Sequence, residues 1–270
     1  MIKKNSLTLS IVIPVYNEEH HLKACLDSIA AQIEQPDEVI VIDNNSVDKT
    51  VEIAKGYGFV TLLKEPKQGV VFARNRGFDA VTSDIIGRID ADSILPPDWT
   101  YYVKHFYAEN SHNDEALTGG CYFYNMRLAR FQGWCQAQIA FRFNRFILGH
   151  YILFGSNMAI PKTMWSDIRH SLCHDNGVHE DLDLAIHAYK AGYKITYRSG
   201  LKVGVKMRRV RSQRDQLWSN LMWWPKTLRR HDRWTWIIGW IGAVFLYAIS
   251  IGGPLIEHIS RFFGYSPINE

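Results

Sequence analysis

The sequence contains few cysteines, and they lack the spacing of a disulfide framework or of a zinc motif. Cys25, Cys121, Cys135 and Cys173 form no C-x-x-C pair and no Cys/His spacing suited to zinc. We therefore expect reduced, mostly buried thiols in a reducing compartment. The residues before the first apolar run, which begins near Ile11, do not include the hydrophobic region of a signal peptide. The catalytic part is accordingly expected to stay in the cytoplasm.

The chain also lacks internal repeats and low-complexity segments, and its charge is unevenly distributed. With 270 residues, of which 47% are hydrophobic and 21% charged, it can bury one large core, or a core plus a small appendage. The formal net charge is +4, yet residues 202–233 hold ten Lys or Arg against two acids. That segment has a charge of +8, which leaves −4 for the remainder.

The basic segment is also rich in tryptophan. Six of the nine tryptophans lie in it or just after it, namely Trp218, Trp223, Trp224, Trp234, Trp236 and Trp240. Basic residues interleaved with indoles suit a lipid headgroup region. Nucleic acid is the competing partner, and we rank it lower because an uncharged run follows directly. We expect membrane lipids as a partner and no nucleic acid.

The uncharged run covers residues 235–256. A helix of that length, at about 1.5 Å per residue, would just cover a hydrocarbon core of about 30 Å. Gly and Pro at 252–254 should weaken or end it, so the segment could span the membrane, lie in the interface or pack on the domain. Because arginines precede the run, we expect anchoring with the catalytic part on the cytoplasmic side of the plasma (inner) membrane. We divide the chain into a catalytic domain, 1–205, and a C-terminal membrane-associated helical tail, 206–270.

Short apolar runs alternate with amphipathic segments in the first half, which predicts an α/β fold with a mostly parallel sheet and helices on its faces. Strands are expected at residues 11–15, 38–43, 59–63 and 85–89. Helices are expected over residues 22–33, 46–57 and 71–81, the second capped by Ser46. Asp43 and the pair Asp90 and Asp92 then follow strands at the sheet edge where ligands of such folds gather.

The second half is less regular. We expect a strand over 116–124, a helix over 127–148, a short strand near 155–160, a helix from Pro161, a helix over 180–191 with Gly192 as its C-cap, and a strand over 194–197.

Carboxylates on a short loop can hold a divalent cation. When a sugar is transferred from a nucleotide sugar, the nucleoside diphosphate departs with two negative charges close together, and a bound cation can offset them. Asp90-Ala91-Asp92 supplies two such carboxylates at a strand end. The pattern also occurs by chance on solvated turns, so its context decides.

That context is given by an ordered series of motifs between residues 9 and 200. They are Ile11-Val-Ile-Pro-Val-Tyr-Asn-Glu18, Val39-Ile-Val-Ile-Asp-Asn-Asn-Ser46 with Asp48 and Thr50, Gly69 with Ala73-Arg-Asn-Arg-Gly77, Ile89-Asp-Ala-Asp92, Gly155-Ser-Asn157 and His179-Glu-Asp181. On these motifs the chain resembles the family 2 glycosyltransferases of GT-A fold. The resemblance implies an inverting transferase that uses Mn²⁺ or Mg²⁺ and a nucleotide-diphospho-sugar donor. It implies a nucleotide-sugar half, 1–115, and an acceptor half, 116–205.

The resemblance also implies roles for residues of the donor site. Pro14, Tyr16 and Glu18 would line the base pocket, Asp43 would bind the base or ribose, and Arg74 would lie close to the diphosphate. Each has a structural alternative. Pro14 can end a strand, Tyr16 can belong to the core, Glu18 can start a helix, Asp43 can begin a turn, and Arg74 can be a solvated helix residue.

Asp92 would coordinate the metal, and Asp90 would support the metal or the ribose. In the family the general base is the Asp of a Glu-Asp pair at a helix start, which corresponds here to Asp181, with Glu180 beside it. Both acids could instead be no more than favourable helix-start residues.

The chain departs from the membrane polysaccharide synthases of this family, which carry a Gln-x-x-Arg-Trp motif. Gln213-Arg-Asp-Gln-Leu-Trp218 lacks that spacing, so we expect transfer of a single sugar rather than a polymer. Arg208, Arg209 and Arg211 could reach the diphosphate or form a basic collar on anionic lipid.

Three hypotheses remain open. The first is a glycosyltransferase that moves one sugar from a UDP- or GDP-sugar to a membrane-associated saccharide or lipid acceptor, such as a polyprenyl-linked one. The second is a nucleotidyltransferase, although Pro-Val-Tyr-Asn stands where its Gly-rich phosphate loop would be. The third is a non-catalytic, membrane-associated scaffold of the same fold. Acceptor selectivity is expected among the aromatic residues between 117 and 165, namely Tyr122, Phe123, Tyr124, Trp134 and Trp165, which could equally be core.

Overall fold

The structure is a computed structural model that describes residues 7–110, 114–124, 134, 137–173, 177–206, 214–231 and 234–244. The chain divides into two compact units. The first unit consists of residues 1–174 and 180–207, and the second of residues 175–179 and 208–270.

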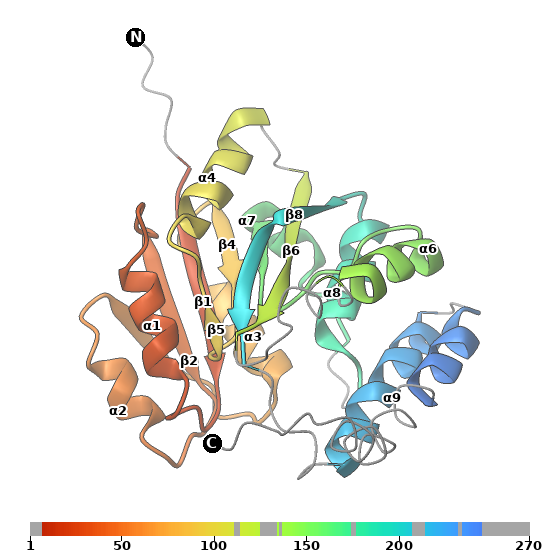
Figure 1. Ribbon diagram of the computed structural model, residues 1–270, viewed down its shortest axis with the longest axis horizontal. Helices are drawn as coiled ribbons and strands as arrows, with labels where there is room; N and C mark the ends of the chain where they lie inside the picture. The colour runs from red at the N-terminus through yellow and green to blue at the C-terminus, as the bar shows by residue number, and fades with distance from the viewer. Residues whose placement is uncertain are drawn as a thin grey trace, which may run out of the picture. The chain divides into compact units, whose positions relative to one another are not determined.

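The first unit is built on one eight-stranded sheet of order β3-β2-β1-β4-β7-β6-β8-β5 (Figure 1). The strands are β1 (Leu9–Val15), β2 (Glu38–Asp43), β3 (Val60–Lys64), β4 (Ile85–Arg88), β5 (Ser93–Ile94), β6 (Glu115–Phe123), β7 (Met158–Pro161) and β8 (Lys194–Val205). The first four strands in this order pair in parallel. β7 then pairs antiparallel with both β4 and β6, so the predicted parallel sheet is continued by a mixed half.

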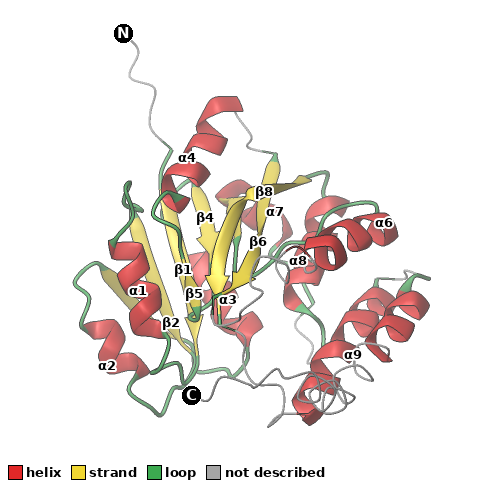
Figure 2. Cartoon of the chain, in the orientation of Figure 1, coloured by secondary structure: helices red, strands yellow, loops and turns green. Residues whose placement is uncertain are grey.

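Helices cover both faces of this sheet (Figure 2). They are α1 (Leu22–Ala30), α2 (Thr50–Lys55), α3 (Val70–Ala80), α4 (Trp99–Asn110), α6 (Asn144–Leu148), α7 (Lys162–Ile168) and α8 (Glu180–Lys190), with a π-helical segment, η1 (Ala137–Phe143), before α6.

Each face of the sheet has its own hydrophobic core, because side chains alternate along a strand. Leu9, Ile11 and Ile13 of β1 pack in the core under α1 and α4. Val12 points the other way, into the core formed with α3, α7 and α8. Figure 1 shows α1 and α4 on the near face of the sheet.

A glycine allows α3 to pack closely against the sheet. A Cβ atom at Gly77 would lie 2.4 Å from Val12 Cγ1 and 2.5 Å from Ile42 Cδ1. Any larger residue would therefore push the helix away from β1 and β2. This close packing fixes α3, which contains Arg74, relative to the strand ends.

Several predicted boundaries were wrong. Ser46 does not cap a helix, because α2 begins at Thr50 and the Ser46 hydroxyl instead accepts a hydrogen bond of 3.1 Å from the Asn17 backbone N–H. The first helix ends at Ala30, and the Ile33 side chain is 77% exposed. β8 extends to Val205, because it pairs with the whole length of β6. Gly192 has a positive φ of 93°, as expected of a helix C-cap.

The described part of the predicted 127–148 helix consists of η1, α6 and position 134, and the remaining residues of that prediction lie outside the described residues.

In the second unit, α9 (Arg214–Arg230) and residues 236–244 are helical. A Cβ atom at Gly239 would lie 2.4 Å from the Trp224 ring, so the two helices touch there. Ile237, Trp240 and Ile241 recur at i, i+3 and i+4 and are 48%, 48% and 59% exposed. The second helix therefore presents an apolar stripe to solvent.

Within the described residues no helix has the length and hydropathy needed to cross a membrane. Residues 245–256 of the predicted membrane segment lie outside the described residues.

Candidate active site

The site is organised around Arg88, a buried arginine at the end of β4. Its guanidinium forms an ion pair with Asp181 and contacts Glu180 Oε1 at 3.0 Å and Asp90 Oδ1 at 3.2 Å. Burial alone would lower the pKa of Arg88, but the charges of Asp181, Asp90 and Glu180 outweigh it and raise the pKa above its usual value. Arg88 thus stays charged and joins the acid motif after β4 to the acid pair that begins α8.

The loop before β7 supplies further contacts to the same acids. The backbone N–H of Gly155 donates to Asp181 Oδ2 at 2.8 Å, and the Ser156 hydroxyl donates to Asp90 Oδ2. A Cβ atom at Gly155 would lie 2.5 Å from Arg88 Nη1 and 2.6 Å from Asp181 Oδ2. Only glycine therefore fits here without displacing the ion pair.

Asn157 fixes this loop to the rest of the sheet. Its amide donates to the carbonyl oxygens of Gly120 and Leu201, each at 2.9 Å, and its carbonyl oxygen accepts the Trp99 indole N–H at 2.8 Å. The side chain is fully buried, so these bonds satisfy polar groups that would otherwise be costly to bury.

Arg74 is buried beside the acid pair at the start of α8. The side chain is fully buried, and its Nη1 donates to the Glu180 carbonyl oxygen at 2.9 Å while Nε and Nη2 bond the Asn75 side chain. Burial lowers the pKa of Arg74, and the charge of Glu180 raises it in part. In this conformation the guanidinium is not open to a diphosphate. Arg74 is also not the solvated helix residue considered as its alternative.

Asp90 and Asp92 lie together near Cys25 of α1. Burial raises the pKa of the Cys25 thiol well above its usual range, and the carboxylates of Asp92 and Asp90 raise it further. The Asp90 side chain is 39% exposed, whereas the Asp92 residue is 8% exposed. Both carboxylates are therefore close enough to Cys25 to act on its thiol, and their binding of a metal stays a prediction.

These residues fit a hard divalent cation. The acids at the site are Asp90, Asp92, Glu180 and Asp181, and their four carboxylates exceed the guanidinium groups of Arg88 and Arg74 by two charges. Mg²⁺ and Mn²⁺ prefer oxygen ligands, and a divalent ion would offset this excess. Asp92 and Asp90 are the residues that would hold it.

The predicted base pocket lies at the ends of β1 and β2. Val15 pairs with Asp43 in register, so Tyr16, which follows β1, lies next to the end of β2, whose last residue is Asp43. Tyr16 is 50% exposed and open to a ligand, while Asp43 is 6% exposed and its Oδ1 accepts the Ser46 backbone N–H at 3.0 Å. Asp43 therefore does begin a turn, and a ligand-binding role for it remains a prediction.

Pro14 and Glu18 flank this edge. Pro14 pairs with Ile42 within the sheet, and Glu18 is 9% exposed with its carboxylate 3.2 Å from His21 Nδ1. Their predicted contacts with a base stay predictions.

Asn44 connects the end of β2 to the loop before α3. Its side-chain N–H groups donate to the carbonyl oxygens of Glu65 and Lys67, and its Oδ1 accepts the Gly69 N–H at 2.7 Å. Gly69 has a φ of 138°, in the region that favours glycine. The loop before α3 is thereby tied to the end of β2.

The aromatic residues expected to select an acceptor divide into two groups. Trp165 is buried, packs edge-on against Phe78 and donates to Asp79, so it belongs to the core. Tyr124 and Trp134 are 42% and 59% exposed. Partial burial raises the pKa of Tyr124, and the negative charge of Asp92 raises it further. Tyr124 therefore lies near Asp92 and is exposed enough to meet a ligand.

Arg208, Arg209 and Arg211 lie outside the described residues.

Arg88 was missed by the sequence interpretation. The signal was present, because Ile-Ile-Gly-Arg-Ile places a charge in an otherwise apolar, buried strand. Such a charge is almost always paired, which predicts acidic partners nearby.

Family models of glycosyltransferases match most of the chain. The model described as glycosyl transferase family 2 matches residues 10–158, and that described as glycosyl transferase family group 2 matches residues 85–264.

Curated relatives match over shorter stretches. The uncharacterized glycosyltransferase YibD of Escherichia coli K12 is 37% identical over 93 residues, which is 33% of this chain and 27% of that protein. The PGL/p-HBAD biosynthesis glycosyltransferase of Mycobacterium bovis BCG is 34% identical over 111 residues, 39% of this chain and 43% of the relative. The matched stretches thus span less than half of either relative.

Solved structures show the same fold. The mannosyltransferase PcManGT from Pyrobaculum calidifontis, in complex with GDP-Man and Mn²⁺, has a TM-score of 0.65 at 16% identity, covering 98% of this chain and 82% of that one. Residues 1–349 of S. aureus TarS give a TM-score of 0.63 at 17% identity, covering 91% and 74%. At these identities the likeness concerns the GT-A fold alone, and it agrees with the fold that the sequence predicts.

Proposed function

The chain belongs to glycosyl transferase family 2, and from this we propose that it transfers a single sugar, with inversion, from a UDP- or GDP-sugar to a membrane-associated saccharide or lipid acceptor. The observation that carries the proposal is the Arg88 guanidinium, which joins Asp90 of the acid motif to Asp181 of the acid pair. A metal-binding group and a base are thereby held on one rigid unit.

Asp181 is proposed as the general base that takes the proton of the acceptor hydroxyl. Such a base must be ionised, and an adjacent guanidinium favours the ionised form of a carboxylate. Its other oxygen is fixed by the Gly155 N–H, which supports a defined orientation toward the acceptor.

Asp92 and Asp90 are proposed to hold a divalent cation that offsets the charge of the departing diphosphate. Tyr16 and Asp43, at the ends of β1 and β2, would bind the base and ribose. PcManGT was solved with GDP-Man and Mn²⁺, and the glucosyl-3-phosphoglycerate synthase of Mycobacterium tuberculosis with UDP-glucose and Mn²⁺, which supports this donor class and metal.

The second unit is proposed to hold the enzyme at the cytoplasmic face of the plasma membrane. The exposed stripe of Ile237, Trp240 and Ile241 supports this, as do the basic side chains of Lys226 and Arg230, both on the exposed side of α9. Tryptophan and basic residues favour the headgroup region. A helix lying in the interface is sufficient for this proposal.

The test is incubation of the full chain with a panel of UDP- and GDP-sugars, Mn²⁺ and a lipid-linked saccharide fraction. Release of a nucleoside diphosphate that depends on one sugar and on the acceptor supports transfer. The anomeric configuration of the product, read by NMR, must be opposite to that of the donor, and a retained configuration would overturn the inverting mechanism.

The other two hypotheses give different products in the same assay. A nucleotidyltransferase would release or consume pyrophosphate, and a scaffold would bind nucleotide without turnover. The residues grouped by Arg88 favour catalysis, because a scaffold has no need of three carboxylates gathered around one buried arginine.

A further inference from the structure

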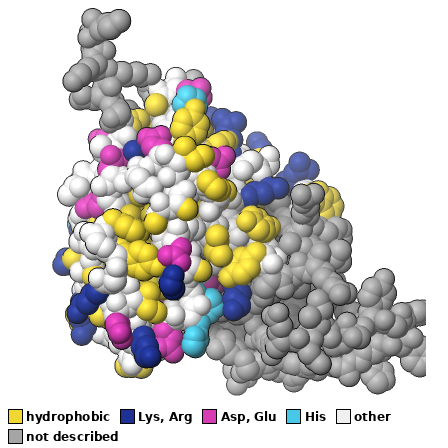
Figure 3. All heavy atoms as spheres, turned by 60° about the vertical axis from the view of Figure 1, so that its left-hand side comes forward, with side chains coloured by type: hydrophobic (Ala, Val, Ile, Leu, Met, Phe, Trp, Pro, Cys, Tyr) yellow, Lys and Arg dark blue, Asp and Glu magenta, His cyan; other side chains and the backbone are white. Residues whose placement is uncertain are grey.

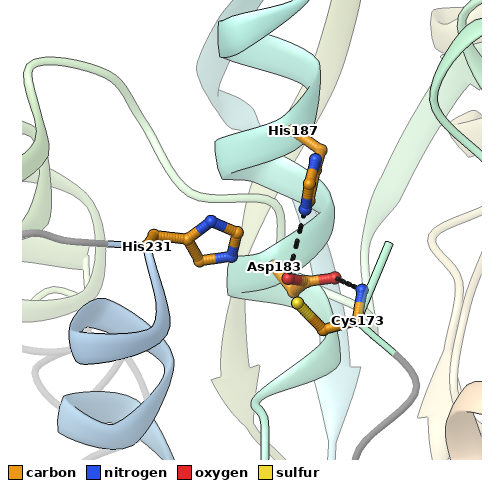
Figure 4. Close-up of side chains that lie close together, drawn as sticks. All are labelled: Cys173, Asp183, His187 and His231. Carbon is orange, nitrogen blue, oxygen red and sulfur yellow. Dashed lines mark hydrogen bonds and ion pairs between the residues drawn. The ribbon is translucent and has the colours of Figure 1, made fainter. Parts of the chain in front are cut away.

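A second cluster of metal-ligating side chains lies in the first unit, apart from the acids at the end of β4. It consists of Cys173, which follows α7, and Asp183 and His187, which are one turn apart on α8 (Figure 4). The Cys173 Sγ, a carboxylate oxygen of Asp183 and a ring nitrogen of His187 all lie within 4.8 Å of one another.

The spacing of these atoms fits ligands around one ion. His187 Nε2 and Asp183 Oδ1 are 3.6 Å apart, which is too long for a hydrogen bond. Zinc bonds of about 2.0–2.3 Å at tetrahedral angles would separate two ligand atoms by about 3.3–3.8 Å. The pair therefore has the separation expected across a bound ion.

The carboxylate is already oriented for this role. Asp183 is 1% exposed, and its Oδ2 accepts the backbone N–H of Cys173 at 2.9 Å, which leaves Oδ1 turned toward His187. A hydrogen bond of this kind is typical of the partners that fix metal ligands.

We propose that Cys173, Asp183 and His187 bind a zinc ion, independently of the Asp90 and Asp92 site. A thiolate, an imidazole and a carboxylate together suit Zn²⁺, whereas Mg²⁺ and Mn²⁺ prefer oxygen ligands alone. Three protein ligands are sufficient when a water or another group takes the remaining position. On binding, the Cys173 thiol loses its proton to the buffer.

The consequence for the fold is a cross-link between the end of α7 and the first turns of α8. Asp183 is two positions beyond Asp181 on α8, so the ion would hold the start of the helix that carries the proposed base. A role as metal ligands accounts for the grouping of the partly buried Cys173 with Asp183 and His187.

The test is titration of the full, chelator-treated chain with Co²⁺ as a spectroscopic substitute for Zn²⁺, without nucleotide. We expect one thiolate-bound Co²⁺ per chain, identified by a thiolate-to-cobalt charge-transfer band, displacement of that band by stoichiometric Zn²⁺, and a higher melting temperature in Zn²⁺. Cys173→Ser should abolish the band, and His187→Gln should weaken Co²⁺ binding at least roughly 10-fold.

The matched control is His105→Gln. His105 pairs with Glu109 at i,i+4, 2.9 Å apart, the same helical arrangement as Asp183 and His187 but without a cysteine in the pair. This variant should bind Co²⁺ as the wild type does. Asp92→Asn should also keep the band, so a failure of the catalytic metal assignment is distinguishable from a failure here. Absence of the thiolate band in the wild type, or its persistence in Cys173→Ser, would overturn the proposal.

Discussion

The carboxylate of Asp181 and the guanidinium of Arg88 form an ion pair inside the first unit, although 93 positions separate them in the sequence. The two side chains are 11% and 2% exposed. Removing Arg88 leaves the buried carboxylate of Asp181 without its guanidinium partner, whereas removing the charge of Asp181 leaves Arg88 still paired with Glu180 and Asp90.

Arg88→Met should therefore destabilise the protein by about 3–5 kcal/mol, because it strands the carboxylates of Asp181 and Glu180 in a buried environment. The measurement is the urea unfolding midpoint. Arg169→Met is the matched control, since its ion pair with Asp79 is 38% and 32% exposed and should be worth about 0–1 kcal/mol. Equal losses of unfolding free energy in the two variants would contradict the prediction that the buried ion pair of Arg88 contributes more to stability than an exposed one.

Asp181→Asn should leave nucleotide binding intact and lower the rate of transfer by roughly 10² to 10⁴. The amide keeps an oxygen for the Gly155 N–H but cannot take a proton from the acceptor. Nucleotide affinity by calorimetry and transfer rate by product release are measured on the same sample.

Glu180→Gln is the companion variant to Asp181→Asn. It should cost less, because Arg74 binds the Glu180 backbone carbonyl oxygen, which the substitution preserves. Near wild-type transfer by Asp181→Asn would mean that the base is another residue, with Glu180 the first candidate.

Asp92→Asn should abolish the stimulation of activity by Mn²⁺, because it removes a charged oxygen ligand beside Asp90. Nucleoside diphosphate release is measured with Mn²⁺ and with EDTA. Asp98→Asn is the control, since Asp98 is an exposed acid six positions further on. Full turnover of the wild type in EDTA would refute the metal assignment.

Gly155→Ala should lower activity by roughly 10²-fold while the chain still folds, because its Cβ would displace the Arg88 and Asp181 side chains. Gly58→Ala tests for a general effect of glycine replacement, since a Cβ there meets nothing within 4 Å. Equal activities of the two variants would show that the close contact at Gly155 is unimportant.

The repeating pattern of the first half was sufficient to predict the parallel strands, the helices on their faces and the positions of Asp43, Asp90 and Asp92 at strand ends. These features depend on local periodicity and on the order of the strands along the chain, and both can be read from the sequence. The pairing of Arg88 with Asp181 and the burial of Arg74 were not predicted, because they depend on contacts between residues about a hundred positions apart. The prediction that Ser46 caps a helix was wrong, because its hydroxyl accepts a hydrogen bond from Asn17 in a neighbouring loop.

Ile237→Glu should weaken binding of the full chain to vesicles that contain anionic lipid, because it places a charge in the exposed stripe of the second unit. Co-sedimentation with the vesicles is measured at low and high salt, and the binding that is lost at high salt is the contribution of the basic side chains. Ile33→Glu is the control, an equally apolar side chain that is 77% exposed in the first unit. Equal binding by the two variants, or no binding by the wild type, would contradict the anchoring proposal.

The antiparallel pairing of β4 with β7 joins two distant stretches of the chain at one point of the sheet. Because Arg88 pairs with Met158, the segment that follows β4 and holds Asp90 meets the segment that precedes β7 and holds Gly155 and Ser156. A one-residue slip of β7 along β4 would turn the alternating side chains of β7 to the opposite face and would move Gly155 away from the Arg88 guanidinium. The site therefore depends on a strand register, and a chain that paired these two strands one residue out of step would fold without assembling it.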